Sequence, residues 1–271
     1  MARTPARGTA TVLRPLSQAN TEPGGQTIAG VVRLLHAIIR PLTKRDWRHQ
    51  EKLPQTGGLV VVANHISNVD PLSLGQFIAF SGRWPRFLGK ASVFKVPVVG
   101  AILRAAGQIP VERQSARSAD ALTAVREAVA DGRAVIIYPE GTITADPDLW
   151  PMVGKTGAAR IALQTGCPVI PVGQWGAQEV MYGNRVHFPK ILPRKTFRLI
   201  VGDPVPLDDL RELPVTAATL KEATGRMMEA ITALVAELRE TEPPAERYDP
   251  RLAAENGPTA QEGPGVPGDQ R

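Results

Sequence analysis

The sequence predicts a single α/β domain, with a mostly parallel central sheet and helices on both faces. Its 271 residues are 43% hydrophobic, which is enough apolar material for one sizeable core. Between residues 51 and 240, short aliphatic runs alternate with stretches of helical periodicity. This alternation is typical of parallel strands joined by crossover helices. Ligands of such folds bind beyond the carboxyl ends of the strands, so the residues that follow each aliphatic run are candidates for a site.

The individual elements follow from periodicity and from residues that start or end helices. Leu59–Ala63 is a wholly aliphatic run and predicts a buried strand. Pro71 suits the first position of the helix that follows, and Gly132 and Gly166 suit the residue after a helix end. In chain order, the predicted strands are 59–63, 86–89, 108–111, 134–138, 169–172 and 196–201, and the predicted helices are 71–80, 97–106, 118–130, 156–165 and 220–239.

Residues 1–25 and 241–271 are rich in Pro, Gly and small polar residues and lack apolar periodicity, so we expect two disordered tails. These tails carry charges of +2 and −3, which leaves +7 on residues 26–240 of a chain whose net charge is +6. A basic body suits an anionic partner such as a phosphate-bearing substrate or acidic lipid. Nucleic acid is not expected, because no recognition motif or interleaving of aromatic and basic residues accompanies the charge.

Residues 26–50 predict an amphipathic helix. Apolar residues recur at helical spacing over 26–42, interrupted by Arg33, His36 and Arg40, and a basic stretch with Trp47 follows. Two placements fit this pattern equally well. The helix lies in a membrane interface with its arginines at the lipid phosphates, or it packs against the protein's own core.

Several features exclude other classes of protein. Cys167 is the single cysteine, so no disulfide framework is possible, and the histidines show no metal-ligand spacing. We therefore expect no metal and no bound cofactor. No secretory signal and no spanning segment of about 18 apolar residues is visible. The expected location is cytoplasmic, peripheral on the inner face of the cell membrane.

The stretch VANHISNVDP, residues 62–71, carries the main candidate for catalysis. His65 follows the predicted strand 59–63, and Asp70 comes five positions later, immediately before Pro71. Five residues correspond to about 500° of helical rotation, so the two side chains cannot share a face of a helix. A turn over 65–69 instead lets Asp70 both cap the following helix and accept from one nitrogen of His65. The other nitrogen is then free to take a proton from a substrate hydroxyl.

Other polar groups follow neighbouring strands. Glu140, Gly141 and Thr142 come directly after the strand 134–138, in a turn whose backbone N–H groups suit an anion. Arg113 follows the strand 108–111 and is the best single candidate for a forked contact with phosphate. Lys90 closes another strand and adds a second positive charge. Taken singly, each block also fits an ordinary turn or a solvated surface charge.

Four of these blocks together resemble the 1-acylglycerol-3-phosphate (lysophosphatidate) acyltransferase family. Asn64-His65 and Asp70 match its NHxxxxD block, and residues 138–142 match its (F/Y)PEGT block. Residues 107–113 and 169–172 are similar to the two remaining blocks, so the resemblance covers about residues 55–205. It implies an acyl donor (acyl-CoA or acyl carrier protein) and a lysophospholipid acceptor. It also implies that His65 is the base and Asp70 its partner, while Arg113, Glu140, Gly141 and Thr142 hold the acceptor.

The chain departs from the family at Ile143, where the family usually has an arginine after PEGT. Either another cation (Lys90, Lys155 or Arg160) takes its place, or the acceptor is not plain lysophosphatidate. The expected function is therefore acyl transfer to a lysophospholipid, most simply 1-acylglycerol-3-phosphate, in phospholipid synthesis. Acylation of another lipid or glycolipid alcohol, and a non-catalytic lipid-binding relative, are the alternatives.

Overall fold

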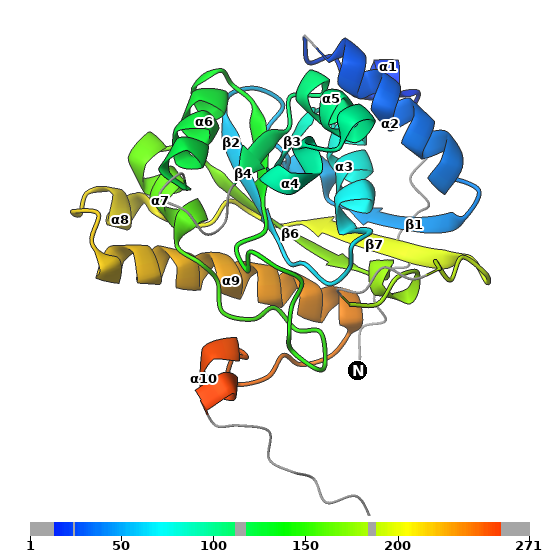
Figure 1. Cartoon of the computed structure of the whole chain (residues 1–271). Coiled ribbons are helices and arrows are strands. Elements are labelled where there is room, and N and C mark those ends of the chain that lie inside the picture. The colour runs from blue at the N-terminus through cyan, green and yellow to red at the C-terminus, as the bar shows by residue number, and fades with distance from the viewer. Residues whose placement is uncertain (1–13, 24, 112–117, 184–187, 256–271) are drawn as a thin grey trace, which may run out of the picture.

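A computed structural model describes residues 14–23, 25–111, 118–183 and 188–255. Its centre is a seven-stranded sheet in the order β1-β7-β6-β2-β5-β3-β4, in which only the β6–β7 pair is antiparallel (Figure 1). The predicted α/β class and the mostly parallel sheet are therefore confirmed. The strands are β1 Thr43–Arg48, β2 Leu59–Ala63, β3 Pro85–Lys90, β4 Ile109–Val111, β5 Ala134–Ile137, β6 Val169–Trp175 and β7 Lys195–Val201.

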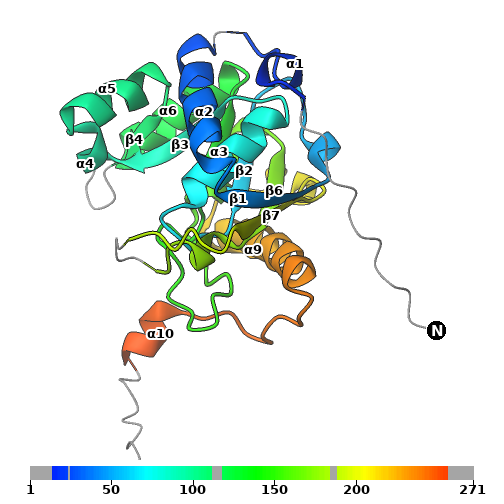
Figure 2. The same ribbon diagram turned by 90° about the vertical axis from the view of Figure 1, so that its right-hand side faces the viewer.

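Helices cover both faces of the sheet (Figures 1 and 2). The alternation of side chains along β2 builds both layers, because neighbouring residues of a strand point to opposite faces. Val60 and Val62 pack with α7 and α9, whereas Val61 packs with Phe77 of α3. The helices are α1 Leu16–Ala19, α2 Gln26–Ile39, α3 Asp70–Phe80, α4 Ala91–Phe94, α5 Pro97–Ala105, α6 Ser118–Ala130, α7 Gly157–Thr165, α8 Asp208–Arg211, α9 Ala217–Arg239 and α10 Pro250–Glu255.

The predicted helix over 26–50 is too long. Helix α2 ends at Ile39, and the basic stretch that follows is the edge strand β1, paired in parallel with β7. Trp47 of this strand is buried, edge-on to Phe77 at a centroid distance of 5.5 Å. A single buried tryptophan among charged residues carries little period-2 signal, so pairing with β7 rather than local sequence decides this strand.

Parts of both predicted tails are ordered and packed. Leu16 of α1 is buried, and Glu22 accepts a hydrogen bond of 2.6 Å from the backbone N–H of Trp84. At the other end, Val153 donates a backbone hydrogen bond of 3.0 Å to Tyr248, and the chain continues into α10. These long-range contacts have no local sequence signal, which is why composition alone marks the segments as disordered. The described part of the chain contains no helix that is both long and apolar enough to cross a membrane.

Candidate active site

His65 and Asp70 meet in the turn between β2 and α3. The Nδ1 atom of His65 lies 2.8 Å from Oδ2 of Asp70. The same Oδ2 accepts from the backbone N–H groups of Ile66 at 2.6 Å and Ser67 at 2.8 Å. A carboxylate oxygen is an acceptor, so Nδ1 carries the proton and Nε2 is the nitrogen left as a base. The predicted turn therefore brings the two residues together.

Asp70 does not cap the helix in the predicted way. Helix α3 begins at Asp70 itself, and no side chain accepts from its first turn. The carboxylate points back into the turn because three donors converge on its Oδ2 there. Burial of Asp70 raises its pKa, and the hydrogen bond from His65 opposes that rise. The carboxylate thus orients the imidazole and closes the turn.

Two polar contacts from distant parts of the chain fix this turn. Asn64 and Gln174 exchange three hydrogen bonds, of 3.0, 2.9 and 2.6 Å, that tie the end of β2 to β6. The hydroxyl of Ser67 donates to the carbonyl of Met181 at 2.6 Å. Ser67 is therefore a structural residue here, which agrees with the lack of a nucleophile motif around it.

The aromatic ring of Tyr138 stacks on the face of the His65 imidazole. The rings of Tyr138 and His65 are stacked, with centroids 4.2 Å apart and planes inclined by 14°. The side chain of His65 is 13% exposed. The ring is thus held by Asp70 at its edge and by Tyr138 on its face, while part of it remains accessible.

Glu140 connects the two sequence blocks. Its Oε1 accepts from the backbone N–H of His65 at 2.8 Å, and its Oε2 accepts from that of Met152 at 3.1 Å. Burial raises the pKa of Glu140 to about 8, although both backbone hydrogen bonds act against the shift. The side chain is therefore a positioning group between the His65 turn and the loop at Met152. That Glu140 holds the acceptor, as the family resemblance implies, stays a prediction.

The other predicted site residues lie in different environments, and one of them falls outside the described residues. Gly141 has a φ of 73° and lies next to Lys155, since a Cβ added to Gly141 would come within 3.0 Å of Lys155 Nζ. Thr142 is exposed. Lys90 ends β3, the sheet neighbour of β5, and is also exposed. Arg113 lies outside the described residues, beyond the edge strand β4.

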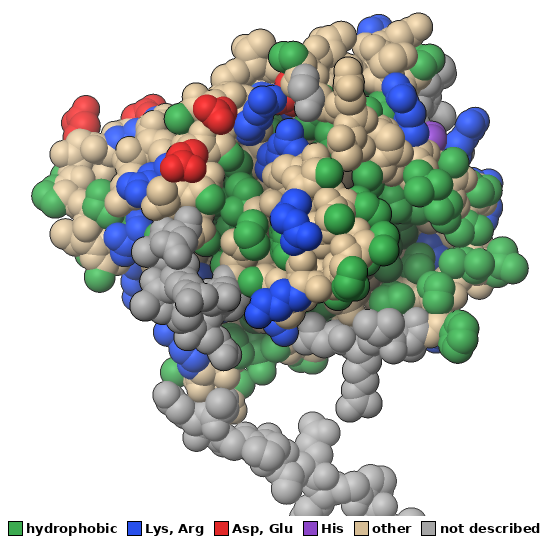
Figure 3. Space-filling model, turned by 45° about the horizontal axis from the view of Figure 1, so that its top comes forward, with side chains coloured by type: hydrophobic (Ala, Val, Ile, Leu, Met, Phe, Trp, Pro, Cys, Tyr) green, Lys and Arg blue, Asp and Glu red, His purple; other side chains and the backbone are tan. Residues whose placement is uncertain are grey.

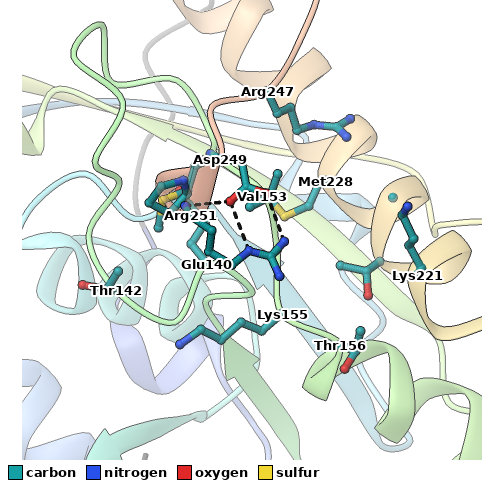
Figure 4. A pocket seen from close by; sticks show the side chains of 15 residues that line it. Glu140, Thr142, Val153, Lys155, Thr156, Lys221, Met228, Arg247, Asp249 and Arg251 are labelled. Atoms are coloured by element: carbon teal, nitrogen blue, oxygen red, sulfur yellow. Dashed lines mark hydrogen bonds and ion pairs between the residues drawn. The ribbon is translucent and has the colours of Figure 1, made fainter. Parts of the chain in front are cut away.

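A cavity of about 880 Å³ lies beside the Glu140 block (Figure 4). Glu140, Thr142 and Lys155 line one part of it, and α9 and the segment leading into α10 line the rest. Volumes of this size are typical of small-molecule sites. Ile143 is buried and does not line this cavity, so its side chain cannot provide a contact there.

Sequence reasoning missed two supports of the imidazole, Tyr138 and Gln174. Tyr138 is the first residue of the (F/Y)PEGT block and could have been considered as a partner of the histidine. Gln174 lies 110 residues from Asn64. Nothing in a single sequence indicates such a pairing.

Comparison with known proteins assigns the domain. Residues 44–175, which span β1 to β6 and include His65, Asp70 and Glu140, match the family model described as Acyltransferase. A chloroplastic 1-acyl-sn-glycerol-3-phosphate acyltransferase of Brassica napus, BAT2, is 36% identical over 148 residues, covering 53% of this chain and 40% of that protein. The 1-acyl-sn-glycerol-3-phosphate acyltransferase of Borreliella burgdorferi is 34% identical over 137 residues, covering 49% of this chain and 52% of that protein. Residues 44–175 belong to the acyltransferase family.

A solved structure has a similar fold. The crystal structure of the 1-acyl-sn-glycerophosphate acyltransferase PlsC from Thermotoga maritima is similar with a TM-score of 0.61 and 22% sequence identity, covering 84% of this chain and 87% of that one. That likeness concerns the fold. The chain spans about half, or less, of the length of the curated relatives named above. Within the acyltransferase domain, the His65–Asp70 pair is the arrangement with the chemistry to activate a hydroxyl.

Proposed function

We propose that this protein is an O-acyltransferase that moves a fatty acyl group from a thioester to the free hydroxyl of a lysophospholipid, with 1-acylglycerol-3-phosphate as the acceptor. The thioester is carried by coenzyme A or by acyl carrier protein. The observation that carries the proposal is the contact of 2.8 Å between His65 Nδ1 and Asp70 Oδ2, which leaves Nε2 as the base. Names of relatives that contain the words 1-acyl-sn-glycerol-3-phosphate acyltransferase support the acceptor class.

The reaction needs no covalent enzyme intermediate. Nε2 of His65 takes the proton of the acceptor hydroxyl as that oxygen attacks the thioester carbonyl, and Asp70 stabilises the imidazolium that forms. The new ester forms as the carbon–sulfur bond breaks. The thiolate that leaves then receives the proton held by His65. Ser67 takes no part, because its hydroxyl is committed to Met181.

An acceptor panel tests the proposal. Purified protein is incubated with a labelled acyl donor, either acyl-CoA or acyl carrier protein loaded with the acyl group. The acceptor is 1-acylglycerol-3-phosphate, another lysophospholipid, a glycolipid alcohol or a phosphate-free monoacylglycerol. Release of free thiol and the mass of the product are both measured. We expect thiol release coupled to diacylglycerol-3-phosphate formation. Acylation of the glycolipid alone would overturn the assignment of a lysophospholipid as the acceptor. Absence of thiol release with every acceptor and with either acyl carrier would indicate a non-catalytic relative.

We also propose that the enzyme acts as a peripheral protein at a membrane surface. One side of α2 packs inward through Ile28 and Val32, while Leu34 and Ile38 are 63% and 53% exposed. Packing on the protein's own core therefore has support for one side of the helix, and contact with a membrane interface has support for the other. Hydrophobic side chains and basic ones share the face of the molecule seen in Figure 3. Exposed aliphatic groups beside basic ones suit the interface of an anionic bilayer.

Replacing Leu34 and Ile38 together with serine is expected to weaken binding to anionic vesicles by roughly tenfold or more, because each buried aliphatic side chain contributes about 1.5–3 kcal/mol at full burial. Co-sedimentation with vesicles measures the change. Leu213→Ser is the matched control, since Leu213 is 49% exposed and lies next to α8, away from α2. Equal binding by the double variant and by wild type would contradict the proposal that the exposed side of α2 faces the membrane.

A further inference from the structure

The cavity beside Glu140 is lined by four cationic side chains (Figure 4). Lys155 comes from the loop before α7, and Lys221 from the second turn of α9. Arg247 comes from the segment that precedes α10, and Arg251 comes from α10 itself. Three of these four residues lie beyond residue 175, where the match to the family model ends. This cavity is therefore partly built by a portion of the chain to which the family motifs assign nothing.

The charge of the cavity is strongly one-sided. Its acidic lining residues are Glu140 and Asp249. Asp249 is paired with Arg251 at 3.0 Å, and burial raises the pKa of Glu140 to about 8, which keeps most of that side chain neutral near pH 7. Within the described part of the chain, neither Lys155 nor Lys221 forms an ion pair. The cavity thus presents a surplus of positive charge to whatever enters it.

Arg247, which feels the negative charge of Glu229, has one side-chain donor without an acceptor in the described part of the chain. Its guanidinium is partly buried, which lowers its pKa, and its Nε is a buried donor with no acceptor among the described residues. A buried donor without a partner destabilises the folded protein. A guanidinium in this state gains more from a phosphate oxygen than an exposed arginine does.

We propose that this cavity binds the phosphate group of a substrate, with Lys221 and Arg247 as its cationic contacts, whereas Lys155 adds positive charge to another part of its wall. The inference rests on the proposed function and extends it to the residues that recognise phosphate. Ile143 is buried outside the cavity and contributes no contact to it. Two sources of phosphate fit this chemistry, the acceptor headgroup and coenzyme A.

Kinetics of the variants Lys221→Gln, Arg247→Gln and their combination test the inference. Each variant removes one charge of the cavity while keeping a polar side chain. The matched control is Arg226→Gln, because Arg226 lies on α9, pairs with Asp209 at 2.7 Å and does not line the cavity. The KM for 1-acylglycerol-3-phosphate, for phosphate-free monoacylglycerol and for acyl-CoA are measured for all four. Lys221 is exposed, so its single variant remains informative if Arg247→Gln fails to fold.

We expect each cavity variant to raise the KM for 1-acylglycerol-3-phosphate about tenfold, as is typical for loss of one charge-assisted hydrogen bond, and to leave the KM for monoacylglycerol unchanged. A rise confined to the KM for acyl-CoA would also support the phosphate site and assign it to the donor. Unchanged KM values for both phosphorylated substrates, or the same rise in Arg226→Gln, would overturn it.

A binding measurement separates this inference from the proposed function. Titration of the wild-type protein with glycerol 3-phosphate, followed by ³¹P NMR, requires no turnover. The phosphorus signal should broaden with wild type and with Arg226→Gln, but not with Lys221→Gln or Arg247→Gln. This result would support the phosphate site even if no acceptor in the panel is acylated. Identical spectra for wild type and the cavity variants, together with unchanged KM values for acyl-CoA, would overturn it even if the panel succeeds.

Discussion

Replacing His65 with alanine is expected to lower the turnover number of acyl transfer by about 10²–10⁴-fold, the usual contribution of a general base. Nε2 is the ring nitrogen left to accept the proton of the substrate hydroxyl, because Nδ1 donates to Asp70. The ring is held by Asp70 and Tyr138, but the turn itself is closed by backbone donors that alanine retains. We therefore expect the loss to fall on turnover rather than on folding.

The measurement is turnover on the best acceptor of the panel, together with a thermal unfolding curve. His49→Asn is the matched control, because His49 is 48% exposed and has a φ of 58°, which asparagine tolerates well. Its turnover should equal that of wild type. A His65→Ala protein that unfolds at the same temperature as wild type and still turns over at near-normal speed would refute the role of His65.

Replacing Glu140 with glutamine is expected to remove much of the pH dependence of stability between about pH 6 and pH 9. The folded-state pKa of Glu140, about 8, lies above the ordinary value of 4.5, so the folded protein binds this proton more tightly than the unfolded chain. The stability from this group is fully present below pH 4.5, falls as the pH rises, and is lost once the pH passes about 8. Between pH 6 and pH 9, the loss amounts to roughly 3 kcal/mol in wild type.

Glutamine cannot ionise, so the free energy of unfolding of the Glu140→Gln variant should lack this decrease. The variant pays a constant cost of about 1–3 kcal/mol, because an amide has one acceptor oxygen for the N–H groups of His65 and Met152. Denaturant unfolding at several pH values measures both effects. The two stability curves should converge as the pH rises. Parallel curves would contradict the raised pKa of Glu140.

The sequence predicted an element correctly where the spacing of its apolar residues matched a single type of secondary structure. β2 is a continuous aliphatic run and was placed at its observed bounds, and α6 likewise. β1 was missed because its pairing partner β7 is about 150 residues away and its own pattern is charged. The packed residues 14–23 were missed for the same reason: Glu22 is held by Trp84, 62 residues along the chain.

In the candidate site too, contacts between residues close in sequence were predicted and contacts between distant residues were not. His65 and Asp70 are five residues apart, so turn geometry was enough to join them. The contact between Glu140 and His65 spans 75 residues, and no pattern in one sequence shows that its carboxylate binds a backbone N–H group. The cationic cavity depends on α9 approaching the loop after β5, and amphipathic periodicity alone does not specify which helix approaches which loop.

Three hydrogen bonds end on a single atom, Oδ2 of Asp70. The orientation of the imidazole and the shape of the turn that presents it therefore depend on the same atom. A substitution at Asp70 alters both, and any event that protonates this carboxylate weakens both together. A substitution at Asp70 therefore cannot separate these two roles. A change that moves the imidazole alone is expected at Tyr138, which contacts the face of the ring.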